Sequence, residues 1–169
     1  MTYISSDTNI WIDFMTIEKL ELPFRLPYTY LMYKEAIENE LLSPADLRSR
    51  LENSGLVSTD IAIEEFYLAE DYGNKYLNLS IYDRIALAIA KNRQIILLTG
   101  DGALRKAAQQ EGVAVMGTIA VLDQLHNEHL VTDAEYGTCL KDLMTNNGKL
   151  VRLPKAELES RLRKLGEAV

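Results

Sequence analysis

One stretch, residues 79–104, constrains the fold more than any other part of the chain, because it reads as helix, buried strand and helix in succession. Ser80 is a favoured helix N-cap, and Asp83 stands three residues later, where an acid stabilises a helix N-terminus. The apolar run 95–98 predicts a short strand buried on both faces, and Thr-Gly-Asp-Gly ends it before a new helix. The stretch therefore places Asp83 at a helix start and Asp101 at a strand exit.

The rest of the chain alternates between short apolar strands and helices in the same way. Further strands are predicted at 3–6, 28–31, 55–59 and 113–116. Further helices are predicted at 10–15, 33–42, 44–51, 60–72, 117–129, 132–145 and 154–166. This alternation predicts an α/β fold with a mostly parallel sheet and a helical C-terminal extension.

The helix predicted at 60–72 has an amphipathic pattern. We expect Phe66 and Tyr67 to face the core and Glu65 to lie on the solvent face. Gly73 is expected to end this helix, because glycine is favoured just past a helix C-terminus.

Composition narrows the class of protein. The chain has 169 residues, 47% of them hydrophobic, which fits one globular domain with one sizeable core. The net charge of −7 argues against broad non-specific adhesion to nucleic acid or anionic lipid. No apolar run approaches the roughly 20 residues that span a bilayer, so no membrane partner is expected. The N-terminus lacks a secretory signal pattern and the single cysteine, Cys139, has no partner for a disulfide, which together favour a cytoplasmic location.

Positive charge gathers in two segments of this acidic chain. Residues 80–110 carry five basic and two acidic side chains, and residues 149–169 carry six basic and three acidic ones, so each segment has a net charge of +3. We expect the two segments to contact phosphates around an acidic site. Solvated helix faces explain the same pattern nearly as well.

Several reactive side chains have a structural explanation. His126 and His129 are three residues apart, but they lack the order of a zinc protease motif and any cysteine cluster, so surface histidines are favoured. Cys139 has no partner that would activate it as a nucleophile and is expected to be buried and inert. Asp7, at the end of the first strand, is equally well a helix N-cap or an acid of a site.

Three segments, in this strand and helix order, resemble the PIN-domain nucleases. They are Ser5-Ser6-Asp7-Thr8-Asn9, Leu79-Ser80-Ile81-Tyr82-Asp83 and the run from Leu97 to Lys106. The chain is most similar to small prokaryotic PIN proteins related to toxin–antitoxin ribonuclease toxins, over about residues 2–130. The resemblance implies a PIN-like nuclease domain at 1–130, with residues 131–169 as a helical extension packed on the same domain.

The family's fold is a three-layer α/β/α sandwich with a parallel five-stranded sheet of order 3-2-1-4-5. In that order Asp7 and Asp101 would flank the crevice where the strand order reverses, which is where open α/β sheets bind ligands.

The resemblance also implies a chemistry carried by carboxylates. Two Mg²⁺ or Mn²⁺ ions activate water and neutralise the phosphate in phosphodiester hydrolysis, and these cations prefer oxygen ligands. The implied catalytic and metal-binding residues are Asp7, Glu35, Asp83 and Asp101, supported by the polar groups of Asn9 and Thr99.

The second acid of this set is assigned by counting along the chain. The count forward from Leu22-Pro23 selects Glu35, but Ala36 follows it where the family usually has leucine. Glu38 therefore stays open as an alternative. Glu40 is expected to point elsewhere, because it does not share their helix face.

The leading hypothesis is a Mg²⁺- or Mn²⁺-dependent endoribonuclease of toxin type that acts on RNA. A protein antitoxin and a second copy of the chain are the further partners that this hypothesis allows. A phosphatase of the haloacid-dehalogenase type is a second hypothesis, but it would need an acid where Asn9 stands. A third is a catalytically degenerate PIN fold kept for binding or oligomerisation, against which the presence of all four acids weighs.

Overall fold

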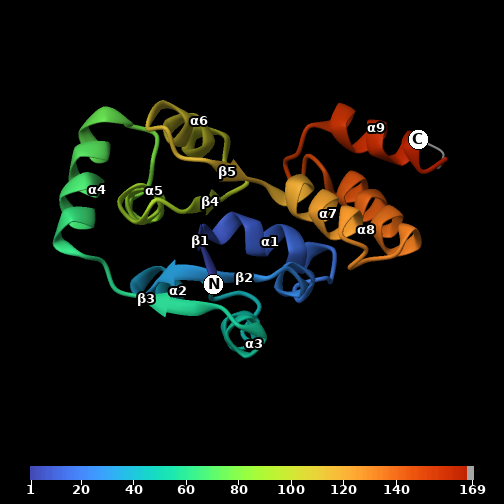
Figure 1. Ribbon diagram of the computed structural model, residues 1–169, viewed down its shortest axis with the longest axis horizontal. Coiled ribbons are helices and arrows are strands. Elements are labelled where there is room, and N and C mark those ends of the chain that lie inside the picture. Colours follow the sequence, from blue (N-terminus) through green and yellow to red (C-terminus); the bar gives the residue numbers. More distant parts are fainter. Residues whose placement is uncertain (167–169) are drawn as a thin grey trace.

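A five-stranded, all-parallel sheet forms the centre of the protein in a computed structural model that describes residues 1–166 (Figure 1). Residues 167–169, the end of the predicted extension, lie outside the described residues. The strands are β1 (Thr2–Ser6), β2 (Tyr28–Tyr33), β3 (Val57–Thr59), β4 (Ile96–Leu98) and β5 (Val115–Met116). Their order is β3-β2-β1-β4-β5, so the direction of strand addition reverses between β1 and β4. The predicted fold class is confirmed.

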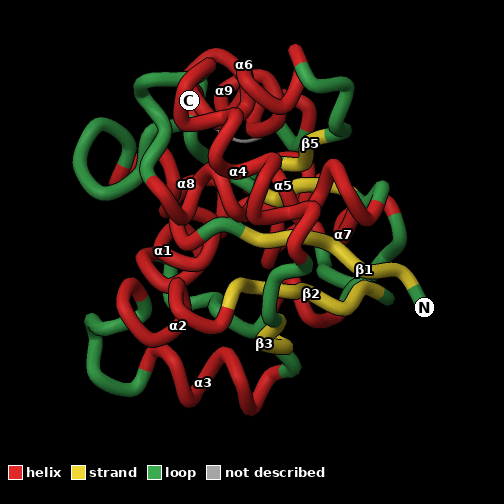
Figure 2. The backbone as a smooth tube through the Cα atoms, turned by 90° about the vertical axis from the view of Figure 1, so that its left-hand side faces the viewer, coloured by secondary structure: helices red, strands yellow, loops and turns green. Residues whose placement is uncertain are grey.

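Helices cover both faces of this sheet, as the predicted sandwich requires. They are α1 (Thr8–Thr16), the 3-10 helix η1 (Leu22–Arg25), α2 (Lys34–Glu40), α3 (Leu47–Ser54), α4 (Ile63–Lys75), α5 (Ile81–Arg93), α6 (Gly102–Gln110), α7 (Thr118–Asn127), α8 (Asp133–Asn146) and α9 (Lys155–Lys164). Figure 2 shows β1 and β2 side by side, with α3 beyond β3 at one edge of the sheet. Within residues 1–166, none of these helices combines the length and the apolar character that crossing a bilayer requires.

Neighbouring residues of β4 enter different halves of the core, because successive side chains of a strand point to opposite faces. Leu97 packs in a cluster with residues of α4, α5 and α6. Leu98 packs in the larger cluster, which contains the fully buried Trp11 and Phe14 of α1 and residues of α7, α8 and α9. Helices α8 and α9 therefore share a core with the sheet.

Helix α4 packs with a different face than its sequence pattern predicts. Phe66 and Tyr67 are 48% and 60% exposed, whereas Glu65 is 1% exposed, so all three expectations are wrong. The physical reason is the neighbouring helix α5, whose Arg93 donates to the Glu65 carboxylate through Nε at 2.8 Å.

Gly73 lies inside α4 and does not end it. A Cβ atom placed on Gly73 would lie 2.0 Å from a terminal nitrogen of Arg84, so the glycine lets the Arg84 side chain of α5 cross closely over α4. Glycine is tolerated here for close packing, and the helix runs on to Lys75.

Candidate functional site

The candidate site lies at the carboxyl ends of the neighbouring strands β1 and β4. The backbone N–H of Asp7, after β1, donates to the carbonyl oxygen of Leu98 in β4 at 2.9 Å. The hydroxyl of the fully buried Thr99 donates to Asp7 Oδ2 at 3.0 Å and accepts from the backbone N–H of Asp101 at 3.0 Å. Thr99 therefore links Asp7 to Asp101 across the point where the strand order reverses.

Three acids of the site also cap helices. Asp7 is the N-cap of α1 and accepts from the N–H of Thr8 at 2.9 Å, and Asp101 is the N-cap of α6 and accepts from the N–H of Leu104 at 2.9 Å. Asp83 forms a capping box with Ser80 at the start of α5. A helix N-terminus favours a negative charge, so the same local sequence that starts each helix also holds a carboxylate there. The N-cap interpretation of Asp7 is confirmed, and its role as an acid of a site stays a prediction.

The electrostatics of these acids show that they lie close together. Burial, then the charge of Asp83 and, least, the charge of Glu40 together raise the pKa of Asp7 to about 7. Hydrogen bonds from Thr99 and Thr8 oppose these effects. Burial also raises the pKa of Asp83, and among its neighbours the charge of Asp101 acts in the same direction. The repulsion thus runs from Glu40 through Asp7 and Asp83 to Asp101.

Glu40, at the end of α2, is the helical glutamate that reaches this group. The Thr8 hydroxyl donates to Glu40 Oε1 at 2.6 Å, and Asp7 and Glu40 line the same small cavity. Glu40 points away from the face of Glu35 and Glu38, as expected, and that direction is the one that leads to the other acids. A signal for it exists in the sequence, because Glu40 is followed by Leu41, and the resembled family usually has leucine after its helical glutamate.

The structure does not bring Glu35 or Glu38 to the other acids. Among the glutamates of α2, the charge of Glu40 is the one that acts on Asp7, and neither Glu35 nor Glu38 lines the small cavity that Asp7 and Glu40 share. Glu35 lies beside Tyr33, whose pKa its charge helps to raise. Five residues of α-helix turn through about 500°, so Glu35 and Glu40 point in directions roughly 140° apart.

The donor chemistry of the four acids fits a hard divalent cation. Glu40 Oε2, Asp83 Oδ1 and Asp101 Oδ2 accept no hydrogen bond from any residue within 1–166. Carboxylate oxygens are what Mg²⁺ and Mn²⁺ prefer. Within the same residues no three histidine, cysteine, aspartate or glutamate side chains already form a metal-binding group. The set therefore offers suitable ligand atoms without a preformed coordination shell.

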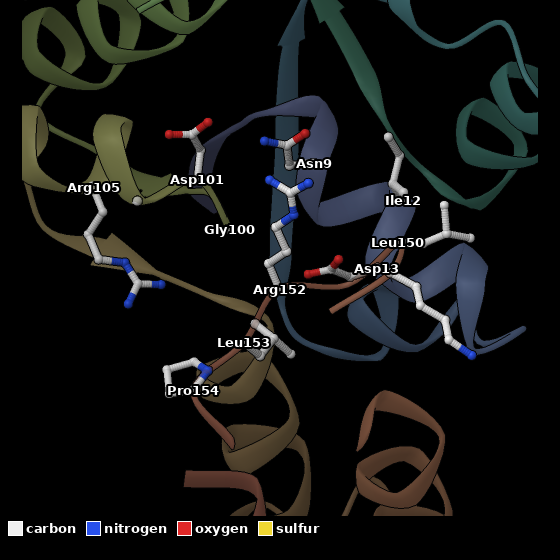
Figure 3. A pocket seen from close by; sticks show the side chains of 12 residues that line it. Asn9, Ile12, Asp13, Gly100, Asp101, Arg105, Leu150, Arg152, Leu153 and Pro154 are labelled. Carbon is white, nitrogen blue, oxygen red and sulfur yellow. The ribbon is translucent and has the colours of Figure 1, made fainter. Parts of the chain in front are cut away.

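A pocket of about 680 Å³ opens beside Asp101 (Figure 3). Its walls come from α1, from the start of α6 and from residues 149–154, and three cations, Arg105, Lys149 and Arg152, line it. Asn9 lies in this pocket, exposed, and it makes no hydrogen bond to the acids within the described part of the chain. Thr99 supports the acids directly, and Asn9 faces the pocket.

Asp13 is a site residue that sequence reasoning missed. It is 6% exposed, lines the pocket, and accepts from the Thr118 hydroxyl at 2.6 Å. Burial raises the pKa of Asp13 to about 6, against the opposing hydrogen bond from Thr118. A Cβ atom on Gly100 would come within 3.4 Å of its Oδ2. The sequence does contain a signal for Asp13, because it is an acid inside the very apolar helix predicted at 10–15, and burying a charge is costly unless it serves a role.

The side chains with structural explanations lie outside this site. His126 bonds Asp133 through Nε2 at 2.6 Å and stacks on Tyr136, with ring centroids 4.1 Å apart. Cys139 is buried, and burial raises the pKa of its thiol to about 11, which makes it a poor nucleophile.

The comparisons with known proteins agree with this geometry. A family model described as "PIN domain" matches residues 3–167. No curated protein matches the chain. Since the family model covers nearly the whole chain and the sheet has the strand order that the resemblance implied, the chain belongs to the PIN-domain family.

Proposed function

We propose that this PIN-domain protein is a Mg²⁺- or Mn²⁺-dependent endonuclease that hydrolyses RNA phosphodiester bonds. The observation that carries the proposal is the convergence of four acids beside the carboxyl ends of β1 and β4: Thr8 bonds both Asp7 and Glu40, Thr99 bonds both Asp7 and Asp101, and the charge of Asp83 acts on Asp7. Carboxylates gathered at the expense of stability, at the ligand-binding edge of an α/β sheet, are typical of a functional site.

In this proposal Asp7, Glu40, Asp83 and Asp101 hold the cations, and Glu40 takes the place that the sequence count gave to Glu35. The bound cations would activate water and stabilise the charge on the phosphate. Thr8 orients two of the four acids, since its N–H bonds Asp7 and its hydroxyl bonds Glu40. Asp7 must lose its proton to act as a ligand, so cation affinity should rise with pH up to about 7.

We further propose that the protein is the toxin of a toxin–antitoxin pair in the cytoplasm. The support is the resemblance to ribonuclease toxins, and the same resemblance supports an antitoxin protein and a second copy of the chain as partners. A short open reading frame directly upstream, encoding a DNA-binding protein that blocks RNA cleavage, is the observation that tests the pairing.

The decisive experiment ranks Glu40 against Glu35 and Glu38, the two other glutamates of α2. We expect Glu40→Gln, like Asp83→Asn and Asp101→Asn, to slow cleavage of a mixed RNA panel by about a hundredfold or more. Glu35→Gln and Glu38→Gln serve as matched controls on the same helix and should cleave at the wild-type rate. Metal-stimulated cleavage that survives Glu40→Gln and is lost in Glu35→Gln would return the second acid to Glu35.

A further inference from the structure

The pocket beside Asp101 concentrates unpaired positive charge in an acidic protein. Arg105, Lys149 and Arg152 line it, and none of their side chains forms an ion pair or a hydrogen bond with any residue of 1–166. Elsewhere cations such as Arg93 and Arg161 are matched by carboxylates. Three unmatched cations in one concave surface of a chain with net charge −7 point to an anionic ligand.

Arg105 is built into the wall of this pocket. Its Nε is buried and has no hydrogen-bond partner within the described residues. Its guanidinium lies against Gly117, where an added Cβ would come within 2.6 Å of a terminal nitrogen. The fold thus makes room for a cation with which no carboxylate of residues 1–166 forms an ion pair, although Asp13 and Asp101 line the same pocket, and such a cation is costly unless a ligand pairs with it.

The opposite wall is a closed loop that we call the strap, residues 147–154. The Asn147 side chain donates to the carbonyl oxygen of Leu153 and accepts from its N–H, both at 2.9 Å. The N–H of Gly148 donates to the carbonyl oxygen of Val151 at 2.8 Å, and Val151 is fully buried. These anchors hold the backbone of the strap in place before any ligand arrives, which reduces the entropy cost of binding.

The anchored strap contributes two cations, Lys149 and Arg152, and three apolar residues to the lining of the pocket. Figure 3 shows the Arg152 side chain extending across it, with the guanidinium directed toward Asn9. Leu150 is 67% exposed although it is apolar, and Ile12 of α1 lines the same pocket. Cations beside exposed apolar surface match a nucleotide, whose phosphate is charged and whose base has an apolar face.

We propose that the strap pocket binds one nucleotide of single-stranded RNA beside the bond to be cleaved. Arg105 and Arg152 contact its phosphate, and Lys149 adds to the positive electrostatic potential that attracts it. Leu150 and Ile12 contact its base. The inference rests on the proposed function, because it names the strand that the carboxylates would cut. An unpaired strand is required, since a base stacked inside a duplex cannot turn its face into a pocket.

The test measures binding separately from cleavage. Fluorescence anisotropy of an end-labelled single-stranded RNA is followed in EDTA over a range of salt, with a duplex of the same length as competitor. The variants are Arg152→Gln, Arg105→Gln and Leu150→Ser. Lys106→Gln is the matched control, because Lys106 is an exposed neighbour of Arg105 on α6 that lines none of the described pockets.

We expect each arginine variant to weaken single-strand binding about tenfold and to lower the salt slope by about 0.7, the value for one lost phosphate contact. Leu150→Ser should weaken binding with no change in the salt slope, and Lys106→Gln should match the wild type. Arg152, Leu150 and Lys106 are exposed, so replacing them should not disturb folding, and thermal melts check all four variants.

Wild-type binding by Arg152→Gln, an equal loss in Lys106→Gln, or a duplex that binds as tightly as the single strand would overturn the inference. These outcomes are distinct from a failure of the proposed function. If RNA is bound through the strap and never cleaved, the proposed nuclease function is rejected and the strap site is kept. If the strap variants cleave RNA and bind it with the dissociation constant of the wild type, only the strap site is rejected.

Discussion

Asp7 is subject to opposed influences that make the stability of the protein depend on pH. Its pKa is about 7 in the folded protein against an ordinary value of 3.8, because burial and the charge of Asp83 outweigh two hydrogen bonds. Between these values the folded protein keeps a proton that the unfolded chain has released. The folded state then binds more protons, so the free energy of unfolding falls as pH rises through this window. The shift corresponds to roughly 4 kcal/mol as an order of magnitude.

We therefore predict that Asp7→Asn is more stable than the wild type at pH 8 in EDTA, with the difference shrinking toward pH 4. The variant should keep a smaller fall between pH 4 and 6, because burial also raises the pKa of Asp13 to about 6. Urea denaturation at a series of pH values measures both effects. Asp71→Asn, at an exposed position of α4, is the control and should follow the wild type. An equally steep fall in Asp7→Asn would mean that Asp7 is ionised in the folded protein throughout.

At the scale of elements, the contacts that sequence predicts are local and those it misses are long-range. Asp83 and Asp101 could be placed because a capping box and a strand exit are written within a few residues. Glu40 could not be placed by counting, because its direction depends on which face of α2 packs against the core, and Ala36 and Ile37 set that face. Glu65 was missed because its partner lies 28 residues away on another helix.

The hydrogen bonds and the ion pair that join Glu65 to α5 lead to a prediction about stability. The carboxylate accepts from Arg93, from Asn92 and from the N–H of Ala62, so it joins α4 to α5 and caps α4. We expect Glu65→Gln to lower the free energy of unfolding at pH 7 by about 2–3 kcal/mol, less than for a fully buried pair because the Arg93 side chain is 30% exposed.

The control for this prediction is Glu64→Gln, an exposed neighbour at the start of the same helix, which should change stability little. These hydrogen bonds lower the pKa of Glu65. Their stabilisation is present above the ordinary pKa of glutamate and is lost as pH falls through the lowered value, so the two proteins should converge in acid. Equal losses in Glu64→Gln and Glu65→Gln would contradict the tie.

For the whole molecule, a cation that binds the four acids should act as a folding ligand. Millimolar Mn²⁺ or Mg²⁺ should raise the melting temperature, with a gain of about 2.7 kcal/mol at a hundredfold excess over Kd. Asp101→Asn should melt higher than the wild type in EDTA, because one repelling charge is gone and asparagine still caps a helix. It should gain less from added metal. A variant that is less stable in EDTA and gains as much as the wild type would make Asp101 a helix cap alone.

The architecture of the molecule could be predicted from the sequence, whereas its main surface pocket could not. Alternating apolar strands and helices were enough for the α/β class, and the family resemblance supplied the strand order. The strap pocket was beyond reach, because it joins α1, α6 and residues 149–154, which meet only in three dimensions. The sequence showed two basic segments, and the structure brings Arg105 of one beside Lys149 and Arg152 of the other.

The placement of the strap late in the chain also orders events during synthesis on the ribosome. All four acids lie within residues 7–101, whereas the strap is followed by α9, which Arg161 fastens to α7 through Asp123 at 2.8 Å. A nascent chain that has completed β4 and the start of α6 therefore carries every carboxylate but only half of the pocket. Under the proposed function, the surface that would hold a transcript is completed only after residue 161 has emerged, so the carboxylates of a growing polypeptide precede the site that would present RNA to them.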